Sequence, residues 1–253
     1  MLVTVRRVVL PFCGIALVIG VWWALVATGL VESTPTPQAV LIRMVEGIRS
    51  GELLVDIRLS VLRVLIGVSI GCTAAVPVGF ALAWFPAVRS MFNPLVSFFR
   101  ALPPLALIPL VIVYLGIEET ARISILVYAA FFSAVIVIYE SVAAIDDVYV
   151  RAARALGATQ FELFRRVVVP LTVPQIFVGV RVALGVCWAT VVAAELVAAE
   201  RGLGAMMQDA ANFFRQTDVY VGIILIGLSA LAMDWIVRLL MTRTVRWQER
   251  VAR

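Results

Sequence analysis

The residue types that most often carry catalysis are absent or scattered in this sequence. Histidine, the most frequent general base and metal ligand, does not occur in the 253 residues. Cys13, Cys72 and Cys187 are far apart in apolar segments, without the close pairing typical of a metal or disulfide site, and we interpret them as packing residues. H-E-x-x-H is absent, and the G-x-S-x-G at residues 67–71, "GVSIG", lies inside an apolar segment of a chain that has no histidine to act as the base of a catalytic triad. We therefore predict that this chain is not an enzyme and binds no metal or cofactor of its own.

The charged residues inside apolar stretches must be accommodated by protein or water. These residues are Arg63, Arg100, Arg181, Glu195 and Asp234. A charge in hydrocarbon costs a few kcal/mol or more, so such residues usually face protein or water. Arg100 shortly precedes Pro103 and Pro104, where a distorted helix frees backbone groups to line a cavity. If the chain carries an anionic solute, we expect its path to run along Arg100, Pro103, Pro104 and Glu195, with Arg100 as a transient contact. The alternative is that Arg100 pairs with a carboxylate such as Glu195 and only holds helices together.

The overall composition identifies an integral membrane protein. Hydrophobic residues make up 63% of the chain and charged residues 15%, whereas about a quarter of the residues of a soluble domain are charged. The length accommodates about six spans of roughly 20 residues in a single domain. All 21 basic residues are arginine, and the net charge of the chain is +5. In a membrane protein such an excess of basic residues usually lies in cytoplasmic loops and does not indicate nucleic-acid binding.

Apolar segments predict six transmembrane helices. They lie at about residues 8–28, 59–84, 94–115, 123–139, 173–199 and 219–240. The second carries Gly67, Gly71 and Gly79, which allow a neighbouring helix to approach closely, and the third is interrupted by "LPPLALIP". The first begins like a signal peptide, but its apolar run is longer than usual and no clear cleavage site follows, so we interpret it as a retained span.

The predicted organisation is one domain with three parts. Residues 1–58 hold the first span and an external segment, residues 59–240 the core, and residues 241–253 a cytoplasmic tail. Within the external segment, the apolar residues between 40 and 48 recur at helical spacing. This pattern predicts a short amphipathic helix, which lies either on the membrane surface or in an ordinary solvated loop.

Arginine counting sets the predicted orientation. With the amino terminus inside, the inner segments hold twelve arginines: Arg6, Arg7, Arg89, Arg151, Arg154, Arg165, Arg166, Arg238, Arg243, Arg246, Arg250 and Arg253. The outer segments hold six: Arg43, Arg49, Arg58, Arg122, Arg201 and Arg215. Because cytoplasmic loops are enriched in basic residues, both termini are predicted to be cytoplasmic. The loop between the fourth and fifth spans is then cytoplasmic as well.

That loop contains the most informative stretch of the chain, "RAARALGATQFELFRRVVVP", residues 151–170. If residues 150–168 form one helix, small and aromatic side chains fall near one face: Ala152, Ala153, Leu156, Gly157, Phe161 and Phe164. Such a face fits a groove of another protein. The alternative is a basic amphipathic helix that rests on anionic lipid headgroups.

The stretch resembles the E-A-A-x3-G-x9-I-x-L-P loop of bacterial ABC importer permeases. Ala152 and Ala153 match the two alanines, Gly157 the glycine and Pro170 the proline. Arg151 stands in place of the glutamate, which reverses a charge. In that family the loop forms the coupling helix that docks in a cleft of the ATPase. The resemblance therefore implies contact with an ATPase through Arg151, Ala152, Ala153, Leu156, Gly157, Ala158, Phe161, Glu162 and Pro170.

The resemblance extends from about residue 35 to the carboxyl end and is greatest to the nitrate, sulfonate and taurine branch of these permeases. It is carried by "SVLRVLIGVSIG", "FFRALPPLALIPLVIVYLGI", "GVRVALGVCWATVVAAELVA" and "RGLGAMMQDAANFF", each at the expected distance from the coupling loop. It implies an all-α membrane protein of the type I importer permease class, with six transmembrane helices and a cytoplasmic coupling helix between helices 4 and 5.

The resemblance also implies partners. These are two copies of an ABC ATPase, a second permease copy, an extracytoplasmic substrate-binding protein and the bilayer of a bacterial inner membrane, with no nucleic acid. ATP and magnesium would bind in the ATPase, because a chain without lysine cannot contain a Walker A motif. The expected cargo is a small anion such as nitrate, a sulfonate or taurine. The alternatives are a permease for an uncharged solute such as a pyrimidine, or a secondary transporter.

Overall fold

The computed structural model describes residues 2–29 and 34–245, and the regular elements within these ranges are helices. In chain order they are α1 (Leu2–Ala27), α2 (Pro37–Arg49), α3 (Glu52–Trp84), α4 (Pro86–Ala101), α5 (Pro104–Leu115), α6 (Glu119–Ala143), α7 (Asp147–Ala155), α8 (Gln160–Leu163), the π-helical η1 (Phe164–Val168), α9 (Val169–Ala198), α10 (Leu203–Asn212) and α11 (Gln216–Thr244). The predicted all-α class is confirmed.

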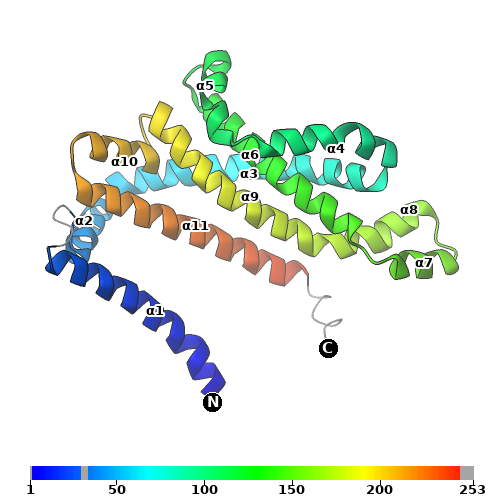
Figure 1. Cartoon of the computed structure of the whole chain (residues 1–253), viewed down its shortest axis with the longest axis horizontal. Coiled ribbons are helices and arrows are strands. Elements are labelled where there is room, and N and C mark those ends of the chain that lie inside the picture. The colour runs from blue at the N-terminus through cyan, green and yellow to red at the C-terminus, as the bar shows by residue number, and fades with distance from the viewer. Residues whose placement is uncertain (1, 30–33, 246–253) are drawn as a thin grey trace.

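Helices α3, α6 and α9 form the centre of the bundle (Figure 1). The predicted close approach at the glycines of α3 is confirmed. A Cβ atom built on Gly71 would lie 2.6 Å from the Cβ of Ala130 and 2.7 Å from the carbonyl oxygen of Val127, and one on Gly79 would lie 2.8 Å from Ile138. Successive glycines of α3 thus meet successive residues of α6, so the two helices run parallel. The chain between them must therefore cross back in the opposite direction, which α4 and α5 do.

The third predicted span is two helices rather than one. Helix α4 begins at Pro86, earlier than expected, and ends at Ala101, and α5 follows at an angle of 95°. The bend falls at Leu102 and Pro103, because Pro103 and Pro104 lack the backbone donors that would continue α4. The predicted break at "LPPLALIP" is therefore confirmed, whereas the expected start of this segment at residue 94 is eight residues too late.

The number of membrane spans stays a prediction. Among the described residues, four helical stretches are long and apolar enough to cross a bilayer, and the bent α4–α5 pair would make a fifth. They are Glu52–Trp84, Glu119–Ala143, Gln160–Val197 and Gln216–Thr244. Helix α1 adds a shorter apolar stretch, Phe12–Ala27.

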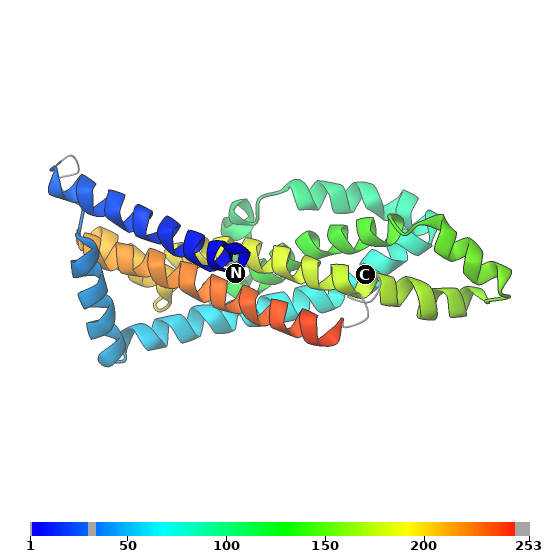
Figure 2. The ribbon, with the colours of Figure 1, turned by 90° about the horizontal axis from the view of Figure 1, so that it is seen from below.

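The short helices gather at the two ends of the molecule. Helices α2 and α10 lie at one end, and α7 and α8 at the other (Figure 1). Figure 2 shows α2 crossing the molecule between the end of α1 and the start of α3. The predicted amphipathic helix is thus α2, which buries Val40 and Gly47 and packs against α3 and α11. Its first turn is capped by Thr36, whose hydroxyl accepts a hydrogen bond from the amide of Ala39 at 3.2 Å.

Part of the predicted organisation lies outside the described residues. This applies to residues 30–33 of the external segment and to residues 246–253 of the predicted tail, with Arg246, Arg250 and Arg253. Of the cysteines, Cys72 and Cys187 are buried as predicted, whereas Cys13 is exposed on α1 and does not pack inside the chain.

Candidate coupling surface and solute path

The segment between α6 and α9 is a helix-turn-helix rather than the single helix expected over residues 150–168. Helix α7 starts at the cap residue Asp146, whose carboxylate accepts a hydrogen bond from the amide of Val148 at 2.9 Å. It ends before Gly157, which has a φ of +83°. Only glycine adopts this left-handed conformation without strain. The glycine therefore stops α7 and turns the chain, and the expectation of one continuous helix is wrong.

Helix α8 begins directly after the turn, because its first turn has a capping residue of its own, Thr159. The hydroxyl of Thr159 accepts a hydrogen bond from the amide of Glu162, and the Glu162 carboxylate accepts one from the amide of Thr159 at 3.1 Å. This reciprocal pair is a capping box, which satisfies two amide groups at the start of a helix. The spacing of Thr159 and Glu162 was visible in the sequence, but the interpretation by hydrophobic periodicity passed over it.

The turn presents apolar side chains away from the bundle. Leu156 is 89% exposed and Phe161 69% exposed, and α7 buries none of its residues. Arg151, Ala152 and Gly157 are exposed as well. Exposed apolar groups framed by charged residues are typical of protein interaction sites. Of the other expected contacts, Ala153, Ala158, Glu162 and Pro170 are half-buried, and Pro170 lies in the first turn of α9 rather than at the tip.

A cavity of about 450 Å³ lies beside the bend between α4 and α5. It is lined by Phe99, Arg100, Leu102, Pro104, Tyr128, Ala129, Phe132, Ser133, Ile136, Val137, Glu140, Val182 and Val186. The hydroxyl of Tyr128 donates to the carbonyl oxygen of Phe99 and ties α6 to the end of α4. Arg100 is exposed at this cavity, and no ion pair of its guanidinium is present in the described part of the chain. The arrangement can therefore offer a cation to a solute.

The other predicted path residues occupy different places. Pro104 lines the cavity, whereas Pro103 is the cap residue of α5. Glu195 is buried at the α10 end of the bundle, where it contacts Arg63 at 2.6 Å and accepts a hydrogen bond from Ser60 at 2.7 Å. The alternative in which Arg100 pairs with Glu195 is therefore wrong, because Arg63 takes that position.

The Arg63 site joins four helices, α3, α6, α9 and α10, and the loop before α10. The Arg63 guanidinium contacts Glu119 at 2.5 Å as well as Glu195, and donates to the carbonyl oxygen of Arg201 at 2.8 Å. The amide of Gly204 donates to Glu195 at 2.8 Å. A Cβ atom at Gly202 would lie 2.6 Å from the Glu195 carboxylate, and its φ is +131°. The glycines of "RGLG" therefore allow the start of α10 to close over this ion pair.

Sequence reasoning missed the contribution of α6 to the cavity. Tyr128, Ser133 and Glu140 line it from α6. Glu140 was passed over because the fourth span was expected to end at Tyr139, which placed it outside the membrane, whereas α6 continues to Ala143. The position of Glu140 directly after the predicted end of the span was the feature of the sequence that could have identified it.

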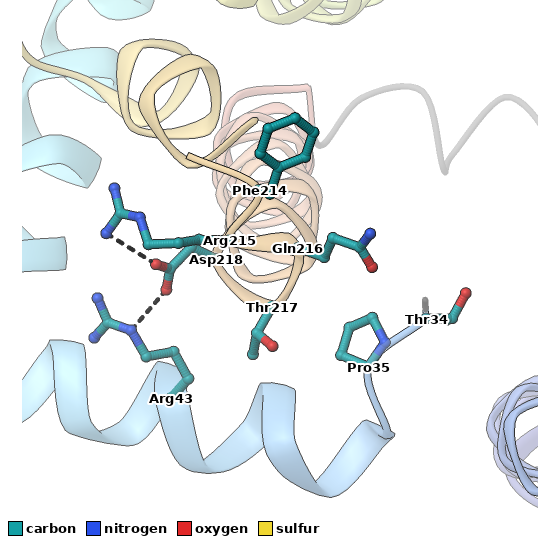
Figure 3. A pocket seen from close by; sticks show the side chains of 8 residues that line it. All are labelled: Thr34, Pro35, Arg43, Phe214, Arg215, Gln216, Thr217 and Asp218. Atoms are coloured by element: carbon teal, nitrogen blue, oxygen red, sulfur yellow. Dashed lines mark hydrogen bonds and ion pairs between the residues drawn. The ribbon is translucent and has the colours of Figure 1, made fainter. Parts of the chain in front are cut away.

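A second open cavity, of about 550 Å³, lies at the α10 end between α2 and the start of α11 (Figure 3). Asp218 lies between two arginines there, at 2.6 Å from Arg43 and 3.2 Å from Arg215. Burial disfavours the charge of Arg43, but the Asp218 and Glu52 carboxylates outweigh this effect and raise the pKa of the guanidinium. Phe214 points away from this ion pair, is 88% exposed and has a φ of +55°. The ion pair fixes α2 to α11 beside the cavity.

Comparison with known proteins decides the family. The sequence pattern described as "Binding-protein-dependent transport system inner membrane component" matches residues 67–246, well over half of the chain. The chain belongs to this family. It is a transmembrane permease of an ABC importer, a transport component rather than an enzyme, and the use of ATP lies with a partner ATPase. Among the described residues, no group of three or more histidine, cysteine, aspartate or glutamate residues could hold a metal ion.

Individual relatives agree with this assignment. The permease is 46% identical to a probable ABC transporter permease protein of Brucella abortus (strain 2308) over 92% of each chain. It is 34% identical to the taurine transport system permease protein TauC of Escherichia coli (strain K12), over 97% of this chain and 92% of that protein. The MetNI methionine ABC transporter in an inward-facing conformation has a similar fold, with a TM-score of 0.57 and 22% identity over 72% of this chain and 93% of that chain.

Proposed function

We propose that this permease carries a small anion of the sulfonate, taurine or nitrate class through the cavity beside Arg100. The observation that carries the proposal is the exposed guanidinium at a cavity of about 450 Å³, next to a bend in which two prolines interrupt the helix. A guanidinium offers paired hydrogen bonds to a planar or tetrahedral anion. The taurine transport relative supports the same class, because taurine carries a sulfonate. Pro103 and Pro104 would hold the bend open.

The role proposed for Glu195 is different. Its side chain is fully buried in the Arg63 site, so in this conformation it does not reach the cavity. We therefore include it as a residue that fixes α3, α9 and α10 relative to one another at the end of the path.

Replacement of Arg100 tests the proposed path. Arg100→Gln should leave the assembled complex and its ATPase activity intact and reduce taurine uptake at least tenfold in proteoliposomes, because the cation that attracts the anion is lost. Arg58→Gln is a matched control, since Arg58 is an exposed arginine of α3 away from this cavity. Unchanged uptake by Arg100→Gln would exclude Arg100 from the path. Loss of the assembled complex would show a structural role instead.

We also propose that the turn at Gly157 docks on the ATPase. The exposed residues Leu156 and Phe161, the glycine turn and the adjacent α7 support this contact. The contacting set is proposed to be Arg151, Ala152, Ala153, Leu156, Gly157, Ala158, Phe161 and Glu162, with Pro170 setting the start of α9. Arg151 would meet an acidic group of the ATPase, because it reverses the charge usual at this position.

A bulky residue at Gly157 tests the docking. Gly157→Trp should uncouple ATP hydrolysis from uptake, because the indole would stand between the turn and the ATPase. Gly116→Trp is a matched control, since Gly116 also has a positive φ, of +75°, and open space around its Cβ position. In both variants the tryptophan must adopt a positive φ, which is strained for a residue with a side chain. If Gly157→Trp transports as well as the unmodified chain, the docking assignment is wrong.

The assembly that we propose has two copies of this permease, two ATPases and one binding protein, in the inner membrane with both permease termini cytoplasmic. The apolar side chains that α4 and α5 leave exposed support a second copy. Phe98 is 60% exposed, Val113 79% and Tyr114 78%. A dimer would cover part of this surface and enclose a path that one chain alone leaves open.

A further inference from the structure

The cavity beside Arg100 also contains a carboxylate, that of Glu140. These two residues are the charged ones among those that line the cavity of about 450 Å³, and both are exposed. Neither has an ion pair in the part of the chain that the structure describes. Ionisable residues within membrane proteins usually pair with one another or mark the pathway of a solute. Two opposite charges that line one cavity without a partner fit the second role.

The cavity follows α6, and its two charges lie towards different ends. Tyr128 and Glu140 both line it, and the rise of an α-helix places them about 18 Å apart along the helix axis. The hydroxyl of Tyr128 donates to the carbonyl oxygen of Phe99, so the neighbouring Arg100 lies towards the Tyr128 end. Glu140 lies at the other end, towards α7. A small solute would therefore meet Arg100 and Glu140 one after the other.

Glu140 also lines a second cavity, which continues towards α7. This cavity has a volume of about 730 Å³ and shares Val137 and Glu140 with the first. A second carboxylate, that of Asp146, lines it as well, and no arginine is among its lining residues in the described part of the chain. The charge along the proposed path thus changes from positive at Arg100 to negative beyond it.

This change of sign affects two kinds of solute differently. A simple anion such as nitrate is attracted by Arg100 and then repelled by Glu140, without a compensating contact. A solute that carries an ammonium group beside its sulfonate can turn that group to Glu140 and donate a charge-assisted hydrogen bond. Unfavourable charge contacts against the wrong ligand are a common source of specificity, and charged side chains determine the selectivity of many membrane pores.

We propose that Glu140 is a specificity-determining residue that makes the permease selective for zwitterions, which carry an ammonium group together with a sulfonate or carboxylate. The inference deepens the proposed function and rests on it, because it requires the solute to pass through the cavity beside Arg100. It assigns a selective step to the permease in addition to that of the binding protein. Simple anions, nitrate among them, are the disfavoured class of solute.

A matched pair of solutes tests the role of Glu140. Taurine and 2-hydroxyethanesulfonate have the same sulfonate and alkyl chain, and differ in an ammonium group against a hydroxyl group. Uptake of each is measured in proteoliposomes of the complete complex with excess binding protein. Because every variant is measured with the same binding protein, a change in the ratio of the two uptake rates originates in the permease. Glu140→Gln should lower the ratio of taurine to 2-hydroxyethanesulfonate uptake by about fivefold or more.

A second measurement needs no binding protein. Ser133→Cys places a thiol in the cavity, in a chain with Cys13→Ala, because Cys72 and Cys187 are buried. The rate of labelling by a small maleimide is measured for the permease assembled with its ATPase, at increasing concentrations of each solute. With Glu140 in place, taurine should slow labelling at a lower concentration than 2-hydroxyethanesulfonate does. In Glu140→Gln the two concentrations should be about equal.

Two further variants are controls. Glu140→Asp keeps the carboxylate and should keep the uptake ratio within about twofold of that of the unmodified chain. Glu118→Gln removes an exposed carboxylate at the other end of α6, which lines neither cavity. This variant should change neither the uptake ratio nor the protection by taurine.

The other outcomes contradict the inference. An unchanged or higher uptake ratio in Glu140→Gln, or a lack of protection by taurine with Glu140 in place, means that Glu140 does not select the solute. An equal loss of uptake of both solutes, or loss of the assembled complex, means that its role is structural. If the proposed path itself is wrong, Arg100→Gln leaves taurine uptake unchanged, whereas failure of the present inference alone leaves the effect of Arg100→Gln intact.

Discussion

Arg63 shows how a buried charge is accommodated in this permease. Its side chain is only 5% exposed and lies between the carboxylates of Glu119 and Glu195. Ser60 and the amide of Gly204 satisfy the remaining acceptor positions of Glu195. A buried ion pair is tolerated when its geometry is good and hydrogen bonds satisfy the remaining polar atoms. Removal of one partner should therefore be more harmful than removal of an exposed charge.

We predict that Glu195→Ala destabilises the folded chain by about 3 kcal/mol, because it leaves the buried Arg63 with Glu119 as its remaining carboxylate partner. The expected result is a lower unfolding temperature and a lower yield of folded protein in detergent. Glu46→Ala is a control, because Glu46 is an exposed carboxylate of α2, and surface changes of this kind stay within about 0.5 kcal/mol. Equal stability of the two variants would contradict the geometry of the Arg63 site.

At the scale of the elements, the packing of α3 on α6 depends on residues without side chains. The glycines of α3 let the two helices run parallel with their backbones in contact. In a membrane the lipid is as apolar as the helix surface, so close packing rather than hydrophobicity drives such association. The position of α6, and with it the wall of the solute cavity, follows from these glycines.

We predict that Gly71→Ala destabilises the chain by about 1–3 kcal/mol, because the new methyl group would overlap backbone atoms of Val127 and Phe131. Gly227→Ala in α11 is the matched control, since a Cβ there meets nothing within 4 Å. That change should be neutral or stabilise by up to about 1 kcal/mol, as alanine favours the helix. The measurement is a comparison of the unfolding temperatures of the two purified variants with that of the unmodified chain. A stabilising effect of Gly71→Ala would contradict the close helix contact.

For the whole molecule, arginines with and without carboxylate partners occur at both ends. At the α10 end, Arg43, Arg63 and Arg215 contact carboxylates, whereas other arginines there have no ion pair within the described ranges. At the end with α7 and α8, Arg166 lies 3.8 Å from Glu162, and Arg151 has no ion pair within those ranges. Arginine enrichment favours the cytoplasmic side of a membrane. The proposed orientation therefore rests on the number of arginines in each predicted loop and stays a prediction.

The orientation leads to a labelling prediction. A cysteine in place of Arg253 should resist an impermeant thiol reagent in intact cells and react after permeabilisation, because the carboxyl end is predicted to be cytoplasmic. Phe213→Cys is the reporter for the opposite side, since Phe213 is 73% exposed next to the end of α10. It should react in intact cells. The unmodified chain with its native cysteines provides the background. Reaction of the cysteine at 253 before permeabilisation would overturn the orientation.

Much of the candidate site was predictable because the relevant signals are local. One glycine, Gly157, and the proline pair Pro103 and Pro104 each determine the backbone conformation at their own position. The chain changes direction at both places. The capping box of Thr159 and Glu162 is equally local. The single helix expected over residues 150–168 was wrong because hydrophobic periodicity continues through a turn that the backbone conformation of one glycine imposes.

The sequence by itself determined that the chain is an all-α membrane permease, because apolar composition, span length and an ordered set of motifs do not depend on how distant segments meet. Only the tertiary structure decided the partners of the charges. Glu195 pairs with Arg63 rather than with Arg100, and Asp234 joins Arg181 of α9 to Arg238 of its own helix. Ion pairing between helices depends on how the helices pack and how each is rotated about its axis. The type of a charged residue and its spacing along the chain do not predict these two properties.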